Sequence, residues 1–292
     1  MLEGLKRLGA DADYDIPDRM TDGYGLNIHL IQRAYDDGVD TVLTCDNGIA
    51  AAEEIAFGKD MGMTVIVTDH HEVPFEEWGG KKQYLLPPAD AVVDPKRPDC
   101  EYPFPHLCGA AVAYKLMEAL WESMGRDSED LDDLIENVAI ATVGDVMDLK
   151  GENRIFVKEG LQMLERTRNP GLRSLIECTG LADKTISAYH IGFVLGPCLN
   201  ASGRLDTAKR ALRLLEAKTR KEADQLAWDL KALNDSRKEM TDIYVKQAVR
   251  SVEENGLMQD RVLVIYLPDC HESLAGIIAG RIRENTISRY SC

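Results

Sequence analysis

The chain has 292 residues and a formal net charge of −16, with 45% hydrophobic and 29% charged residues. This composition predicts a soluble globular protein with a core large enough for two domains, and it argues against a protein that coats nucleic acid with a broad basic surface. Apolar runs are shorter than the ~20 residues of a membrane-spanning helix, no signal peptide opens the chain, and the seven scattered cysteines fit reduced thiols, so we expect a cytoplasmic location and no membrane.

The first segments are predicted to form two helices with a short strand between them. Residues 2–9 are typical of the end of a helix, and residues 13–16 of a short strand. Residues 26–37 are predicted to form a helix that stops at Gly38. A doubly wound domain has a strand before its first helix, whereas this chain starts inside a helix. We therefore expect the chain to be truncated at its start.

The next segments are predicted to form a β-α-β unit. Residues 39–48 and 63–71 each contain a short β-branched run that stops on acidic or imidazole side chains. The helix-like stretch 49–60 lies between them, so the two strands should run parallel and end at the same edge of a sheet. In an open α/β sheet, ligands bind outside the carboxyl ends of the strands. We expect the polar side chains at both strand ends to share one site.

Two carboxylates and two imidazoles stand at these strand ends. Asp46 follows the first strand, and Asp69, His70 and His71 follow the second. Carboxylates with neutral imidazoles suit Mn²⁺, Mg²⁺, Fe²⁺ or Zn²⁺, and a carboxylate-rich set favours the harder ions. Two ions that share a carboxylate can activate water and neutralise a phosphoryl group. An Asp46 that only caps the next helix is the alternative, but the adjacent histidines favour a metal site.

Three further segments complete the first half of the chain. Residues 89–94 are predicted to be a short strand, and residues 107–124 a helix with the apolar spacing of a core element. A third segment, from residue 131 to Gly144, is predicted to be an apolar helix that leads to Asp145. From the residues alone, neither Asp145 nor Asp148 is preferred as a further metal ligand.

The second half is predicted to be mostly helical. Residues 161–175 form a helix with scattered arginines and a gently basic surface, and residues 192–205 a glycine-containing loop. In such a loop, small residues let the backbone approach a ligand, although a simple loop before a capped helix is the alternative. Residues 207–254 are predicted to be a nearly unbroken helix that connects two domains, with a coiled-coil dimer as the alternative. Residues 261–267 begin a new strand, followed by a helix from about Ser273.

Several stretches resemble, in order, the DHH phosphoesterases, and in particular the RecJ branch of single-strand-specific 5′-to-3′ DNA exonucleases. They are DRMTDGYGLN, TCDNGI, VIVTDHHEVP, AVVDPKRPDCEYPF, LCGAAVAYKL, ATVGDVMDL, GPCLNASGRLDTA and LPDCHESLAGIIAGRI. The resemblance implies an α/β fold with a parallel-sheet DHH domain at residues 1–165. It also implies a helical connector with the GPCLNASGRL loop at residues 166–256, and the beginning of a second α/β domain, called DHHA1, at residues 257–292.

The resemblance implies roles for the candidate residues. It makes Asp46, His70 and Asp145 ligands of Mn²⁺ or Mg²⁺. Asp69 and His71 become catalytic residues that ligate metal, orient a ligand or contact the scissile phosphate. Three residues should approach the substrate: Asn200, Arg204 and His271.

The family also carries an Asp-x-Asp motif on a strand before the first helix. This sequence has no equivalent, because Asp11 and Asp13 follow the helix. A bridging carboxylate would be lost, so we expect little or no nuclease activity from the 292 residues. The chain also stops before the family's glycine-rich substrate motif.

The implied activity is metal-dependent hydrolysis of single-stranded DNA in repair or recombination. The implied partners are single-stranded DNA and a single-strand-binding protein or helicase, and the implied state is a monomer. One alternative is a phosphoesterase for short oligonucleotides or cyclic dinucleotides. Another is a catalytically silent member of the family that binds DNA or a partner protein.

Overall fold

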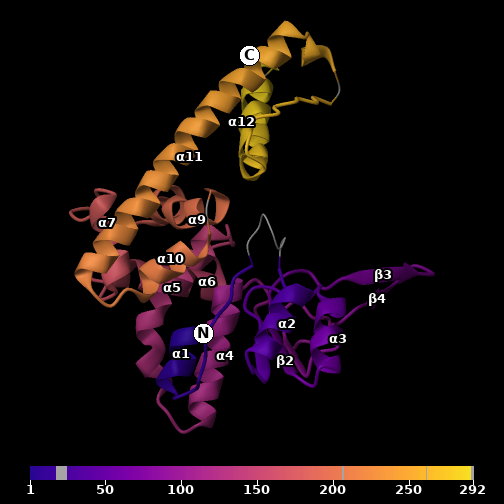
Figure 1. Cartoon of the computed structure of the whole chain (residues 1–292), viewed down its shortest axis with the longest axis vertical. Helices are drawn as coiled ribbons and strands as arrows, with labels where there is room; N and C mark the ends of the chain where they lie inside the picture. The colour runs from indigo at the N-terminus through magenta and orange to yellow at the C-terminus, as the bar shows by residue number, and fades with distance from the viewer. Residues whose placement is uncertain (18–24, 206, 261, 291–292) are drawn as a thin grey trace.

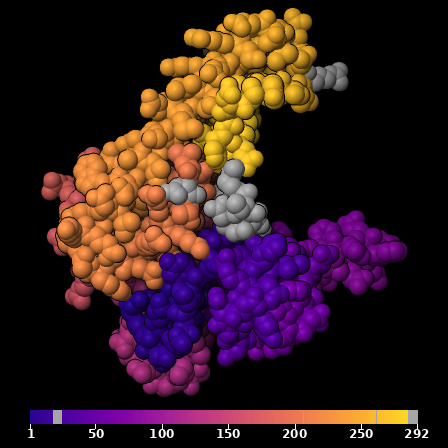
Figure 2. All heavy atoms as spheres, in the orientation of Figure 1, coloured from indigo at the N-terminus to yellow at the C-terminus, as the bar shows by residue number. Residues whose placement is uncertain are grey.

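The computed structural model (Figure 1) describes residues 1–17, 25–205, 207–260 and 262–290, with side chains up to residue 284. A small sheet with its helices forms one part, a group of helices packs beside it, and one long helix leads to a C-terminal helix. On the face in Figure 2, the surface is hollowed between the C-terminal helix and the part that contains the sheet. Among the described residues, no helix is long and apolar enough to cross a membrane.

The sheet confirms the predicted parallel β-α-β unit. Its strands β1 (Thr41–Leu43), β2 (Thr64–Thr68) and β5 (Ala91–Val93) lie in the order β1-β2-β5, and both pairings are parallel. Between β1 and β2 runs α3 (Ala52–Asp60), which starts three residues later than predicted. Parallel strands need such a crossover, and it brings the ends of β1 and β2 to the same edge of the sheet.

Helix α3 packs on β2, and α2 (Ile28–Asp36), close to the predicted 26–37, packs on α3. Ile55 of α3 is fully buried against Val65 and Val67, which alternate along β2 as a half-buried strand requires. This apolar contact fixes β2, and therefore fixes the position of the polar residues that follow it.

Helices that pack beside the sheet form a second hydrophobic core. They are α1 (Leu2–Arg7), α4 (Gly109–Ser123), η1 (Ser128–Leu134), α5 (Ile135–Gly144) and α6 (Gly151–Leu164). Large side chains with little exposed surface, such as Met117, Trp121 and Leu131, fill the space between them. Because α4 also contacts β2, this core holds α5 and its C-terminal end beside the sheet.

The helix predicted at residues 161–175 is wrong in its bounds. The α6 helix ends at Leu164, and a separate helix, α7 (Pro170–Cys178), begins after a short loop. Asn169 caps α7 by accepting a hydrogen bond from the backbone N–H of Leu172 at 3.0 Å. Proline at the first helical position leaves no unpaired N–H, so Asn169 and Pro170 together start a new helix.

The predicted GPCLNASGRL loop is also wrong, because these residues form a helix. After α8 (Ala188–His190), a π-helical segment, η2 (Ile191–Leu195), continues directly into α9 (Gly196–Leu205). The proline of the motif lies in the first turn of α9, where it is tolerated. Cys198 packs with Leu172, Leu175 and Leu230 in a third hydrophobic core, and Ala201 is also fully buried. Tertiary packing therefore outweighs the glycine and proline content.

The long helix predicted at residues 207–254 is interrupted once. It consists of α10 (Lys209–Glu216) and α11 (Arg220–Glu254), with Thr219 capping α11 by accepting a hydrogen bond from the N–H of Glu222 at 3.3 Å. The 35 residues of α11 span about 52 Å at 1.5 Å per residue. Its first half packs on α7 and α9 in the third core, and its last part packs on α12 (Glu272–Tyr290).

Two predicted strands are not formed. Residues 13–16 have no regular structure, and neither do residues 262–267, which follow the short helix η3 (Leu257–Gln259). The second segment keeps the alternation of a strand, since Leu263 and Ile265 pack on the α11–α12 core while Val264 and Tyr266 are 80% and 83% exposed. A strand needs a neighbour to pair its backbone groups, and the described residues offer none there.

One hairpin was not predicted from the sequence. Strands β3 (Phe75–Trp78) and β4 (Lys81–Tyr84) pair antiparallel around Gly79 and project from the sheet. All their residues are exposed, so no hydrophobic face marks them in the sequence.

Candidate metal centre

The turn after β1 carries the first candidate ligand. The backbone N–H of Asp46 donates to the carbonyl of Thr68 at 3.0 Å, which continues the β1–β2 ladder by one more bond. Asp46 then takes a positive φ of 65° and Gly48 one of 112°. The hydroxyl of Thr44 closes the turn by donating to the carbonyl of Asn47 at 2.6 Å. A non-glycine residue in the left-handed region is strained, and such strain is common at functional sites.

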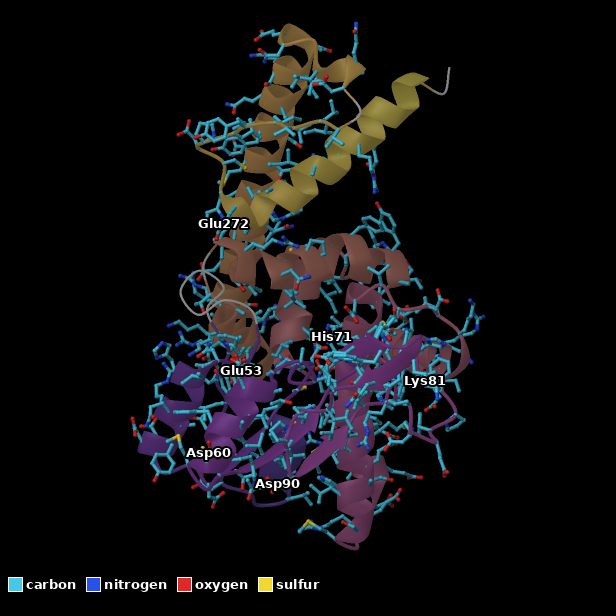
Figure 3. All side chains as sticks on the ribbon, turned by 90° about the vertical axis from the view of Figure 1, so that its right-hand side faces the viewer. Glu53, Asp60, His71, Lys81, Asp90 and Glu272 are labelled. Atoms are coloured by element: carbon cyan, nitrogen blue, oxygen red, sulfur yellow. The ribbon has the colours of Figure 1, made fainter. Side chains whose placement is uncertain are left out.

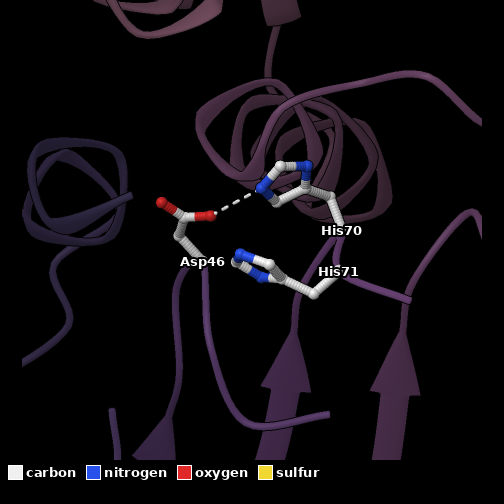
Figure 4. Close-up of side chains that lie close together, drawn as sticks. All are labelled: Asp46, His70 and His71. Atoms are coloured by element: carbon white, nitrogen blue, oxygen red, sulfur yellow. Dashed lines mark ion pairs between the residues drawn. The ribbon is translucent and has the colours of Figure 1, made fainter. Parts of the chain in front are cut away.

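Asp46, His70 and His71 converge at the carboxyl ends of the two strands (Figure 4). Nε2 of His70 lies 2.9 Å from Oδ1 of Asp46, and the two imidazole centroids are 4.5 Å apart. One donor atom from each of the three residues lies within 4.8 Å of the others. One cation can therefore reach all three donors.

Asp145 joins this cluster through His70. It caps the C-terminal end of α5, and its Oδ2 lies 3.4 Å from Nε2 of His70. The chain then turns sharply, because Val146 has a positive φ of 56° and is 88% exposed. Asp148 lies apart from the cluster and pairs with Lys150 at 2.9 Å, which lowers the pKa of Asp148. The structure therefore brings Asp145, and not Asp148, next to the strand ends.

Asp69 is buried and fully occupied by protein hydrogen bonds. Its carboxylate accepts from the backbone N–H groups of Ile49 at 3.0 Å, His70 at 2.7 Å and His71 at 3.2 Å. Nδ1 of His71 also lies 2.6 Å from Oδ1 of Asp69. Burial alone would raise the pKa of Asp69, but these hydrogen bonds outweigh it and lower the pKa. Asp69 is thus a positioning residue, and it orients His71 with Nε2 directed away from it.

His70 is a buried imidazole that lies between two carboxylates. Its side chain is 7% exposed, and neither ring nitrogen has a hydrogen-bond partner of acceptable geometry among the described residues. The carboxylate of Asp46 raises the pKa of His70, and burial opposes that effect. A buried imidazole left without hydrogen bonds between two carboxylates fits a divalent cation, because these donors suit Mn²⁺ or Mg²⁺.

Gly109 is a supporting residue that the sequence analysis missed. It is the first residue of α4, and a Cβ at this position would lie 2.5 Å from both Cβ and Cγ of Asp46. Carbon atoms in contact are normally 3.5–4.0 Å apart. Only glycine therefore lets α4 approach the Asp46 side chain so closely. The signal was present in the LCGAAVAYKL stretch, but a glycine at a helix start does not reveal which side chain packs on it.

The three predicted substrate residues lie on α9 and before α12. Asn200 is exposed on α9. Nη1 of Arg204 donates to the carbonyl of Ser273 at 2.9 Å, and Nδ1 of His271 lies 2.7 Å from the Ser273 hydroxyl. Arg204 and His271 are thus brought together across almost 70 positions of sequence, through Ser273 rather than through the Asp46 cluster. Most of the DRMTDGYGLN stretch, residues 18–24, lies outside the described residues.

The parallel sheet and the carboxylate–imidazole cluster at its carboxyl edge define an α/β protein with a site suited to divalent metal. Residues 1–142 match the model of the DHH family, N-terminal domain. A crystal structure of exonuclease RecJ bound to manganese is 32% identical, with a TM-score of 0.83 over 98% of this chain and 69% of that chain. This chain belongs to the DHH family, in its RecJ branch.

Curated relatives agree with that assignment. The single-stranded-DNA-specific exonuclease RecJ of Bacillus subtilis (strain 168) is 36% identical over 97% of this chain, and that of Salmonella typhimurium 35% identical over 96%. A crystal structure of RecJ in complex with Mn²⁺ from Thermus thermophilus has a TM-score of 0.77 and 30% identity, covering 98% of this chain and 39% of that chain. This chain spans 34% and 50% of the two curated relatives.

Proposed function

We propose that this chain carries the metal-binding half of a phosphodiester hydrolase that acts on single-stranded DNA from its 5′ end. The observation that supports this most strongly is the convergence of donors from Asp46, His70 and His71 within 4.8 Å. Four side chains would hold metal: Asp46, His70, His71 and Asp145. The RecJ relatives, whose names state activity on single-stranded DNA and whose structures contain manganese or magnesium, support the choice of substrate and ion.

Each residue of the cluster has a distinct task in this proposal. A bound divalent cation would lower the pKa of its water and neutralise charge on a phosphoryl group. His70, held between Asp46 and Asp145, fixes the distance between the two carboxylates. Asp69 holds His71 in one tautomer and one orientation, so that Nε2 faces the site. In Figure 3, His71 lies below Glu272, the first residue of α12, in the part that contains the sheet, and Figure 2 shows the hollow between that part and α12.

Arg204 and His271 are proposed to contact the substrate from the other side of that hollow. Their link through Ser273 joins α9 to the start of α12. A guanidinium that can bind phosphate oxygens in a bidentate manner suits a single strand held by its phosphates. Asn200, exposed on the same helix as Arg204, is included in this substrate surface.

The metal-binding part of the proposal is tested by calorimetric titration with Mn²⁺. We expect one specific Mn²⁺ site in the wild-type chain, loss of that site in His70→Ala, and at least tenfold weaker binding in Asp145→Ala. Asp148→Ala is the matched control, because it removes a neighbouring carboxylate that lies outside the cluster. Equal weakening in both aspartate variants would overturn the proposed site.

Hydrolysis is measured with 30-nucleotide single strands labelled at the 5′ or the 3′ end, with a duplex and with a dinucleotide. Mn²⁺-dependent release from the 5′ end of the single strand alone supports the proposal, whereas turnover of the dinucleotide alone would favour the small-substrate alternative. We expect a low rate, because the described cluster offers ligands for little more than one cation. Robust digestion would contradict that expectation about rate, but not the assignment of the site.

A single-strand-binding protein or a helicase is the expected partner, the expected state is a monomer, and the expected process is DNA repair or recombination. A cytoplasmic location is supported by the cysteines, since the six in the described part of the chain are all free thiols. Size-exclusion chromatography with light scattering tests the monomer.

A further inference from the structure

A pocket on the opposite flank of the molecule from the sheet has a strongly basic lining. It lies where the loop after α6, the start of α7 and the start of α11 meet, and its volume is about 430 Å³. The lining consists of Arg166, Thr167, Arg168, Pro170, Arg173 and Arg220. Four guanidiniums and no carboxylate line one hollow, in a protein whose net charge is −16. Like charges repel one another, so guanidiniums held this close cost electrostatic free energy unless anions offset it.

Only two of these four arginines are neutralised by neighbours. Nε of Arg173 lies 3.3 Å from Glu177, and Arg220 pairs with Glu177 and with Asp224. Arg166 and Arg168 are exposed, and neither guanidinium has a hydrogen bond or ion pair among the described residues. The positive charges of Arg166 and Arg168 are therefore available to bind an anion.

The backbone around the pocket adds to this positive potential. Pro170 is the first residue of α7 and Arg220 the first of α11, so the N-terminal ends of a 9-residue and a 35-residue helix lie at the same hollow. Each helix N-terminus carries a partial positive charge of about half a unit. Thr167 is held in place, because its hydroxyl donates to Glu136 at 2.9 Å and accepts from the N–H of Asn169 at 3.1 Å. The pocket is thus fixed by contacts that do not depend on a ligand.

This pocket is separate from the metal centre. Glu136, which contacts Thr167, stands at the start of α5, whereas Asp145 caps the other end of the same helix. Nine residues of helix between them correspond to about 14 Å. A ligand in the pocket therefore does not touch Asp46, His70 or His71.

We propose that this pocket, which we call the arginine pocket, binds a phosphate group. A planar guanidinium matches two phosphate oxygens, and the absence of aromatic residues from the lining argues against recognition of a base. Its volume of about 430 Å³ lies within the range of small-molecule ligand sites, about 300–1,000 Å³, so a phosphate group has room to enter. The phosphate belongs either to the backbone of a nucleic acid strand or to a free anion such as inorganic phosphate. The inference does not require the metal centre to be active.

The test uses two probes in the presence of EDTA, which removes any contribution from bound metal. Inorganic phosphate is titrated by calorimetry, and a fluorescent 30-nucleotide poly(dT) by anisotropy at several salt concentrations. The variant is Arg166→Ala/Arg168→Ala, and the control is Arg154→Ala/Lys158→Ala, which removes the same charge from two exposed residues of α6. Thermal unfolding of each variant checks that the fold is retained, and Arg166→Lys/Arg168→Lys, which keeps the charge, replaces the alanine variant if that one fails to fold.

The two sources of phosphate give different results. If the ligand is a strand phosphate, poly(dT) binds at least tenfold more weakly to the pocket variant, and the slope of log K against log salt falls by about 0.7 for each lost contact. If the ligand is a free anion, only inorganic phosphate loses affinity, again by at least tenfold. Both probes binding the pocket variant as tightly as the control variant would overturn the proposal.

Discussion

Replacing Gly109 by alanine should disable the metal centre without destabilising the fold. The new Cβ would lie 2.5 Å from Cβ and Cγ of Asp46, so the atoms must separate by about 1.0–1.5 Å to reach normal contact. Because Cβ of Asp46 is fixed to the backbone, the exposed turn at Cys45 and Asp46 is the part that has to move. Ligand distances in metal sites are held to about 0.2 Å. A displacement several times larger removes Asp46 from the coordination sphere.

The magnitude follows from the loss of one carboxylate ligand. Even partners that only orient a ligand are worth 10- to 100-fold in metal affinity, so we expect Gly109→Ala to weaken Mn²⁺ binding by at least that much, or about 1.4–2.7 kcal/mol. Meanwhile, alanine in a helix is favoured over glycine by about 0.5–1 kcal/mol. The metal-free variant should therefore unfold at about the same temperature as the wild type.

The assay is Mn²⁺ titration by calorimetry, combined with thermal unfolding in EDTA. Gly144→Ala is the matched control, because Gly144 also lies in a helix beside a candidate ligand, and a Cβ there meets no atom within 4 Å. The control should bind Mn²⁺ like the wild type. A Gly109→Ala protein that binds Mn²⁺ within about twofold of the control would refute the reasoning from contact distances.

Three further substitutions test other parts of the structure. Asp69→Asn should cost about 2–4 kcal/mol of stability, since charged hydrogen bonds are lost. Hydrogen bonds lower the pKa of Asp69 below 3.8 against the effect of burial. The contribution of Asp69 to the free energy of unfolding should therefore be constant above pH 3.8 and shrink as the pH falls further. A wild-type advantage in urea unfolding that is independent of pH from 6 to 3 would contradict this. Glu136→Gln should stabilise the protein at neutral pH, because burial raises the pKa of Glu136 and a glutamine oxygen can still accept from Thr167. The gain in stability should disappear below the ordinary glutamate pKa of 4.5, where wild-type Glu136 is neutral in both the folded and the unfolded state. Thermal unfolding at pH 7 and pH 4 measures this gain. A gain of equal size at both pH values would count against a charge effect. Leu230 lies in the core around α11 and is 0% exposed. Leu230→Ala should lower the free energy of unfolding in urea by about 2–5 kcal/mol and leave the Mn²⁺ affinity unchanged. A parallel loss of Mn²⁺ binding would show that this core supports the metal centre.

The convergence of the candidate metal ligands was largely predictable, because most of them follow strands whose pattern is local. The alternation in β2 and the crossover helix α3 fix the edge where Asp46 and His70 meet, and both features can be read from residues 52–68. Asp145 is different. It reaches His70 only through the packing of α4 and α5, which no local pattern reveals, so the resemblance to the DHH family was needed to select it over Asp148.

The missed helix at residues 196–205 and the missed hairpin at residues 75–84 have different physical causes. The glycine and proline of the GPCLNASGRL stretch favoured a loop, but burial of Cys198 and Ala201 in a helical core outweighs that preference. In the hairpin, Gly79 and Gly80 have the positive φ values, 58° and 76°, of a tight turn. Both faces of that hairpin are exposed, so the alternation that announces a strand is missing. Long-range packing explains the missed helix, and the absence of packing explains the missed hairpin. Neither can be read from a local sequence pattern.

The long helix α11 belongs to two hydrophobic cores at once. Ala227 and Leu230 pack into one of them, and Ala248 packs with Leu274 and Ile278 in the other. Both cores share this one continuous helix, so loss of either core removes packing that stabilises the helix. We therefore expect the unfolding of the two cores to be coupled, and heating should produce one calorimetric transition that involves both.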